Sequence, residues 1–146
     1  MPSAERSITV AVSPPDFMVL LLDFESYPSF LPDMCTAEVL KQSASGWEVR
    51  FSLQVIRRLT YTLALTQPTP LSLQWTLVEG LFRANSGGWS LQPDGDHGTL
   101  ATYSIDIQLG MFVPGNILNS LVAQGLPQTL EHFREEASRR AGVLTG

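Results

Sequence analysis

The sequence predicts an α+β fold, in which a curved antiparallel sheet of about six or seven strands wraps around one long C-terminal helix. Residues 34–109 contain successive segments of alternating apolar and polar side chains, separated by turn residues. This pattern is typical of an antiparallel meander with one buried face. Residues 117–141 instead place apolar side chains at three- and four-residue steps, which indicates an amphipathic helix.

The length, composition and net charge of the chain exclude several classes of protein. The chain has 146 residues, of which 44% are hydrophobic and 16% are charged. This length predicts a single domain over residues 1–146, and the composition excludes a disordered tail or a coiled coil. The formal net charge of −5 does not favour nucleic acid as a partner, because nucleic-acid binding usually needs a basic face.

The N-terminal region predicts one strand and two short helices. Residues 7–12 alternate with period two, as a half-buried strand does. Ser13 and the two prolines after it are suited to a helix start, and residues 16–24 are apolar nearly all round, so this helix should be buried. Pro28 and Pro32 make residues 25–32 a kinked corner rather than part of a long helix.

The middle of the chain predicts the remaining strands. The turn residues between them are rich in Gly, Pro, Asp and Ser, and the alternation resumes after each turn. The expected strands cover residues 36–41, 47–55, 59–65, 71–77, 83–92 and 99–109.

The last helix presents one apolar stripe that can cover the dry face of the sheet. Gly125 and Pro127 should bend this helix near its middle. The stripe consists of Ile117, Leu118, Leu121, Val122, Leu126, Leu130, Phe133, Ala137 and Ala141.

No combination of residues in the sequence predicts a catalytic or metal centre. Neither His97 nor His132 has a carboxylate partner or a nucleophile evident nearby. Cys35 is the only cysteine, which excludes an intrachain disulfide and favours a small buried side chain over a nucleophile. We therefore expect no catalytic residue, no metal and no cofactor.

Two segments resemble a known family. The first is Asp-Phe-Glu-Ser-Tyr-Pro-Ser-Phe-Leu-Pro at residues 23–32, with Cys35 just beyond it, and the second is Glu-Gly-Leu-Phe-Arg at residues 79–83, which leads into Ser-Gly-Gly-Trp-Ser-Leu at 86–91. Together they resemble the coenzyme Q-binding and polyketide cyclase/dehydrase branch of the START-like, helix-grip superfamily. The chain departs from close relatives at Asp33, where Trp is frequent, and at Leu81, where Pro is frequent.

The resemblance implies a deep apolar cavity between the sheet and the last helix. Fully packed aromatic side chains are the alternative, but a sheet that grips one helix has difficulty filling its own interior. The residues expected to line a ligand site are Tyr27, Phe30, Phe51, Leu63, Trp75, Leu77, Phe82, Trp89, Tyr103, Ile105, Phe112, Leu118, Leu121 and Val122. Glu79 and Arg83 are candidate polar anchors for a ligand head group, or else a surface ion pair.

An apolar loop precedes the last helix and would lie at the rim of such a cavity. It consists of Met111, Phe112, Val113 and Pro114. Because loops are usually polar, an apolar loop indicates a lid, a transient membrane contact or a partner contact, unless it folds back onto the core. An exposed apolar rim would also favour a homodimer. The N-terminus lacks the pattern of a signal peptide, so we expect a cytoplasmic protein.

Three functions follow from these expectations. The leading hypothesis is a non-catalytic carrier, chaperone or sensor that binds an isoprenoid quinone or another lipid-like molecule. The second is a polyketide aromatase/cyclase that folds a poly-β-ketone and uses Glu79, Arg83 or Tyr103 in proton transfer. The third is a ribosome-associated regulator, because some bacterial relatives are described as ribosome-association toxins. The negative net charge ranks it last.

Overall fold

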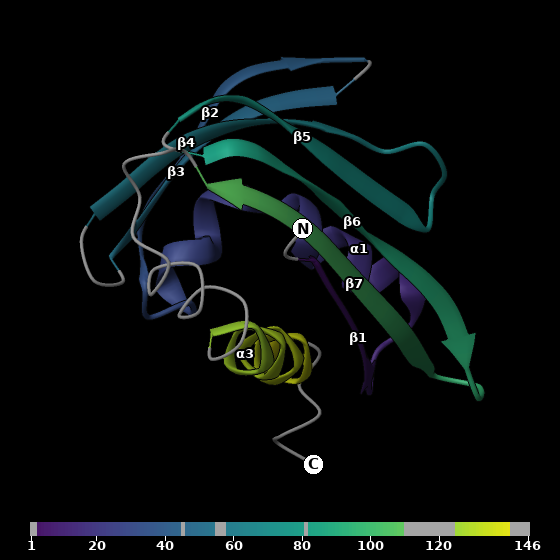
Figure 1. Ribbon diagram of the computed structural model, residues 1–146. Coiled ribbons are helices and arrows are strands. Elements are labelled where there is room, and N and C mark those ends of the chain that lie inside the picture. Colours follow the sequence, from purple (N-terminus) through teal and green to yellow (C-terminus); the bar gives the residue numbers. More distant parts are fainter. Residues whose placement is uncertain (1–2, 45, 55–57, 81, 110–124, 141–146) are drawn as a thin grey trace.

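The computed structural model describes residues 3–44, 46–54, 58–80, 82–109 and 125–140, and its elements follow the predicted order (Figure 1). The helices are α1 (Pro14–Leu22), the 3₁₀ helix η1 (Phe24–Ser29) and α3 (Gly125–Arg140). The strands are β1 (Ser3–Val10), β2 (Met34–Ser43), β3 (Gly46–Gln54), β4 (Arg58–Thr66), β5 (Ser72–Gly80), β6 (Phe82–Asp94) and β7 (Gly98–Leu109).

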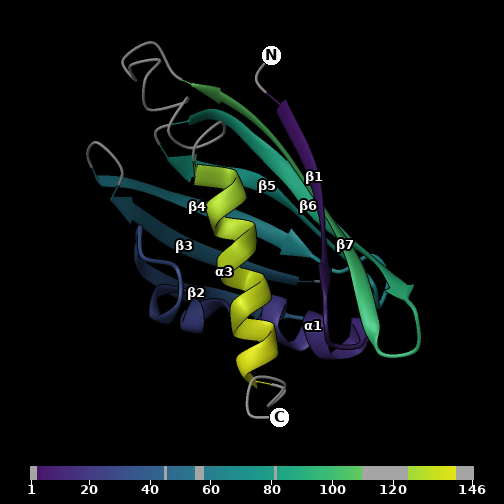
Figure 2. The same cartoon turned by 90° about the horizontal axis from the view of Figure 1, so that it is seen from below.

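One antiparallel sheet of seven strands confirms the predicted α+β class. Its strand order is β1-β7-β6-β5-β4-β3-β2. Every pair of adjacent strands is therefore consecutive in the chain, except the pair of β1 and β7. The sheet curves over the helices, and α3 crosses its concave face (Figures 1 and 2). Within the described residues, no helix is long and apolar enough to cross a membrane.

The first strand and the corner that follows α1 have other boundaries than the sequence predicts. β1 begins at Ser3 rather than residue 7, because it pairs along its whole length with β7, from Ser3 opposite Asp106 to Val10 opposite Thr99. A backbone ladder of this kind needs no apolar alternation. The predicted kinked corner is η1, and Pro28 lies inside it.

The described part of the last helix, α3, covers Gly125–Arg140, and Gly125 of the predicted bend is its first described residue. Leu130, Phe133 and Ala137 of the predicted stripe are buried. The part of the stripe before Gly125, and the apolar loop at 111–114, lie outside the described residues.

One phenyl ring on α3 joins the helix to both the sheet and the corner. The ring centroid of Phe133 lies 5.3 Å from Tyr27, 5.2 Å from Phe30 and 5.4 Å from Trp89, all in edge-to-face geometry. Aromatic pairs at this spacing each add about 0.5–1.5 kcal/mol to the burial of their surface. α3 is therefore attached to both the sheet and the corner through aromatic contacts.

Candidate ligand cavity

A cavity of about 220 Å³ lies between the concave face of the sheet, the segment after η1 and the first half of α3. Its wall is mainly aromatic and aliphatic. Seven of the sequence-predicted ligand residues lie on this wall: Tyr27, Phe51, Leu63, Trp75, Trp89, Tyr103 and Ile105.

The strand alternation explains why these side chains meet. On β4, Tyr61, Leu63 and Leu65 follow one another at two-residue steps and all line the cavity. Side chains at such steps share a face of the sheet. Trp89 of β6 stands opposite Tyr103 of β7, so neighbouring strands add their rings to the same face.

Ring contacts make a continuous aromatic wall. The ring centroid of Tyr103 lies 5.0 Å from Trp89 and 5.5 Å from Trp75. The ring centroid of Phe51, also on the wall, lies 5.7 Å from that of Tyr61 and 6.0 Å from that of Tyr27. The wall is thus held in shape by its own packing before any ligand binds.

The other predicted residues have different positions. Phe30 and Leu77 are half-buried against the core but are not on the cavity wall. Glu79 is exposed near the end of β5, away from the cavity wall. The side chains of Phe82 and Arg83 lie outside the described residues, as do Phe112, Leu118, Leu121 and Val122.

The tyrosine hydroxyls of the wall are neutral groups. Burial raises the pKa of Tyr27, Tyr61 and Tyr103, and the proximity of Tyr61 raises that of Tyr103 further. Tyr27 donates a hydrogen bond of 2.5 Å from its hydroxyl to the carbonyl oxygen of Leu21 in α1. These hydroxyls therefore serve as hydrogen-bonding groups and not as phenolates near neutral pH.

The wall also contains one buried amide. Asn85 on β6 is only 5% exposed, and its Oδ1 accepts a hydrogen bond of 3.2 Å from Nε1 of Trp75. Polar residues at the edge of the cavity come from elsewhere: Asp33 follows η1, and Gln128 and His132 belong to α3. Apolar ligand sites typically combine such a wall with a few polar groups.

Comparisons with known proteins place this architecture in a family. Residues 10–134 match the family described as "Polyketide cyclase / dehydrase and lipid transport". The chain belongs to this family. The predicted START-like resemblance is thereby confirmed, and the cavity occupies the space between sheet and helix that the resemblance implied.

Individual members of the START-like family are similar over most of the chain. The "Ribosome association toxin RatA" of Escherichia coli (strain K12) is 27% identical over 111 residues, which are 74% of this chain and 69% of RatA. A START superfamily protein from Mycobacterium smegmatis has a TM-score of 0.82 at 19% identity, covering 94% of this chain and 97% of that one. The Zhui aromatase/cyclase from Streptomyces sp. R1128 has a TM-score of 0.85 at 18% identity, covering 96% and 95%. These two structures show the shared fold.

Several residues of this START-like cavity were absent from the predicted ligand site. The most informative is Asn85, which shares the odd-numbered phase of Trp89 and Leu91 on β6. A polar residue on the dry phase of a strand is a signal that could have identified it. His132 and Phe133 of α3 also line the cavity.

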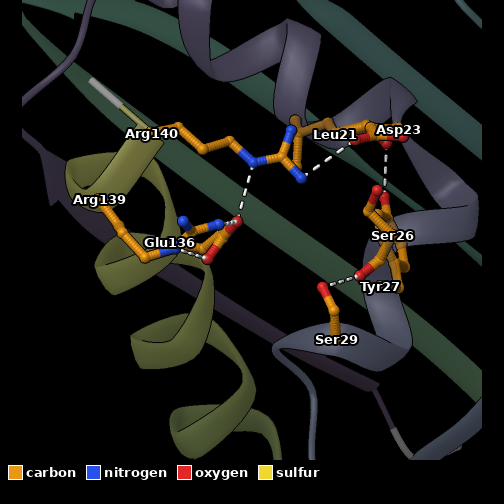
Figure 3. A network of polar contacts seen from close by, with 8 residues as sticks. All are labelled: Leu21, Asp23, Ser26, Tyr27, Ser29, Glu136, Arg139 and Arg140. Atoms are coloured by element: carbon orange, nitrogen blue, oxygen red, sulfur yellow. Dashed lines mark hydrogen bonds and ion pairs between the residues drawn. The ribbon is translucent and has the colours of Figure 1, made fainter. Parts of the chain in front are cut away.

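The end of α3 away from the cavity edge is held by a charged network (Figure 3). Glu136 is only 6% exposed and accepts hydrogen bonds from Arg139 at 2.8 Å and from Arg140 at 2.9 Å. Arg140 also lies 3.0 Å from the carboxylate of Asp23, which follows α1. Hydrogen bonding and charge from Arg139, and then from Arg140, lower the pKa of Glu136, while burial opposes the shift.

Proposed function

We propose that this chain binds an apolar small molecule in the cavity between the sheet and α3. The observation that carries the proposal is the cavity of about 220 Å³. Its wall is mostly aromatic and aliphatic, and the strands, the corner and the helix all contribute to it. Removing apolar ligand surface from water there contributes roughly 25 cal/mol per Å² to binding. The lipid-transport members of the family support the same conclusion.

The role proposed for the chain is that of a carrier, chaperone or sensor rather than a cyclase. The cyclase hypothesis offered Glu79, Arg83 and Tyr103 as candidates for a proton-transfer residue beside a bound substrate. Glu79 is exposed and off the cavity wall, and burial holds Tyr103 in its neutral form. A bound molecule would therefore meet hydrogen-bonding groups along the described wall, and Glu79 would not reach it.

A cavity-filling variant tests the proposal. Leu63 lies on the wall and is 6% exposed, so Leu63→Trp places extra volume in the cavity, whereas Leu63→Met keeps the volume nearly constant. Titration with the fluorescent probe 1-aminoanthracene should show binding to the parent and to Leu63→Met. Binding to Leu63→Trp should be at least about tenfold weaker. Equal affinity for all three folded proteins would overturn the proposed site.

Ribosome association is a second candidate, favoured by the name of the relative RatA. It requires cationic groups that can contact RNA phosphates. Three arginines on α3, Arg134, Arg139 and Arg140, are each already paired with a carboxylate. Cosedimentation with ribosomes that falls steeply with salt concentration would support this candidate, and a flat dependence would remove it.

A further inference from the structure

Asn85 places a primary amide on an otherwise largely apolar wall. It lies on the inward face of β6, opposite Ile107 of β7 and four residues before Trp89, and its side chain lines the cavity. A buried amide is costly unless its polar atoms find partners. Its retention on this face therefore needs a physical reason.

The indole of Trp75 sets the orientation of this amide. An indole N–H can only donate a hydrogen bond, so the atom of Asn85 that lies 3.2 Å from Nε1 must be the carbonyl oxygen. The amide nitrogen, with two N–H donors, consequently points away from the indole. Asn85 can thus donate hydrogen bonds from its amide nitrogen to a molecule in the cavity.

Trp75 can take this position because a glycine stands opposite it. Trp75 of β5 pairs with Gly87 of β6, and a Cβ atom at Gly87 would come within 2.9 Å of Cζ2 of the indole. The indole also packs against Tyr103, with ring centroids 5.5 Å apart. Glycine and tyrosine together fix the indole, and the indole fixes the amide.

The charges around the cavity restrict what the amide can receive. Among the described residues of the wall, none is Lys or Arg, and the tyrosines are neutral. An anionic head group, such as the carboxylate of a fatty acid, would find no lysine or arginine partner on the described wall and would lose its hydration. A neutral carbonyl oxygen needs only a donor.

We propose that Asn85 is a specificity-determining residue that donates a hydrogen bond to a carbonyl oxygen of a neutral, ring-containing ligand. This inference rests on the proposed function and adds to it a residue that recognises the ligand, because Asn85 would favour a molecule with a ring carbonyl over the same skeleton without one. The amide selects for the oxygen, and the aromatic wall accepts the ring.

Two ligands of matched skeleton test the inference. α-Tetralone carries one ring carbonyl, and 1-methyltetralin replaces the oxygen with a methyl group. Neither is a thiol-reactive compound, so Cys35 does not interfere. Their affinities are measured by displacement of 1-aminoanthracene from the parent, from Asn85→Leu and from Asn85→Ala. The second variant leaves room for water to solvate the indole N–H, should the first fail to fold.

The ratio of the two dissociation constants is the readout, because changes of cavity size affect both ligands alike. Loss of the donor should shift this ratio about tenfold toward 1-methyltetralin in both variants. A ratio that stays within about twofold of the parent's, with both ligands still binding, would overturn the role of Asn85 and leave the proposed function intact. If neither ligand nor 1-aminoanthracene binds the parent, the proposed function itself fails.

Discussion

Arg140 in the last turn of α3 lies 3.0 Å, from Nη2 to Oδ2, from Asp23 in the link between α1 and η1 (Figure 3). The same side chain donates from Nε to Glu136 at 2.9 Å. One guanidinium thus ties the C-terminal end of α3 to the corner that carries Tyr27. The residues of α3 that line the cavity, from Gln128 to Phe133, lie toward its other end.

The first prediction concerns Glu136, the buried centre of this network. Glu136→Gln removes the charge that two arginines share, and we expect a loss of about 1–2 kcal/mol in the free energy of unfolding. Urea denaturation measures it. Glu131→Gln is the matched control on the same helix, because its partner Arg134 is 43% exposed and such pairs contribute less than about 1 kcal/mol. A larger loss in the control would contradict this account.

The pH dependence of stability should report the same group. The folded-state pKa of Glu136 is lowered from its usual value of 4.5, so the carboxylate stabilises the fold above that pH. This contribution should disappear as pH falls through the lowered pKa. The difference in unfolding free energy between the parent and Glu136→Gln should therefore be largest near neutral pH and should decrease in acid. A difference that is constant down to strongly acidic pH would exclude Glu136 as its source.

The third prediction concerns Tyr27. Its hydroxyl donates to the buried carbonyl of Leu21, so Tyr27→Phe should lower the free energy of unfolding by about 1 kcal/mol without changing the ring packing. Tyr103→Phe is the control, since no hydrogen bond from Tyr103 to the backbone is present among the described residues. Thermal unfolding measures the stability of both variants. A greater loss of stability in Tyr103→Phe than in Tyr27→Phe would contradict this assignment.

Gly87 provides the fourth prediction. A Cβ atom there would lie 2.2 Å from the carbonyl oxygen of Ser104 and 2.9 Å from the indole of Trp75. Gly87→Ala should therefore destabilise the protein by about 2–3 kcal/mol and alter tryptophan fluorescence. Gly95→Ala is the matched control, because Gly95 has a φ of +70° but no atom within 4 Å of its Cβ direction. Its cost should be limited to the backbone, about 1 kcal/mol.

Local patterns were sufficient for much of this architecture. Alternation along β4 predicted that Leu63 lies on the buried face of the sheet and lines the cavity. The three- to four-residue spacing of Leu130, Phe133 and Ala137 predicted the buried side of α3. These properties depend only on the periods of a strand and a helix, which the sequence displays directly.

Contacts between distant residues could not be obtained in this way. The pairing of β1 with β7 is a backbone ladder across almost the whole chain, and the contact of Arg140 with Asp23 depends on where two helices end. Asn85 was missed for another reason. The phase of Asn85 on its strand was readable, but its significance depends on the indole of Trp75, which has room because its partner Gly87 on β6 carries no side chain.

The central claim, that the cavity holds an apolar molecule, is tested most directly by recovering that molecule. The parent and Leu63→Trp are each exposed to a cellular lipid extract, purified and denatured, and the released small molecules are identified by mass spectrometry. We predict that the parent releases a neutral, carbonyl-containing apolar compound in near-stoichiometric amount and that Leu63→Trp releases far less. Release of no apolar compound by the parent beyond that from Leu63→Trp would contradict the account.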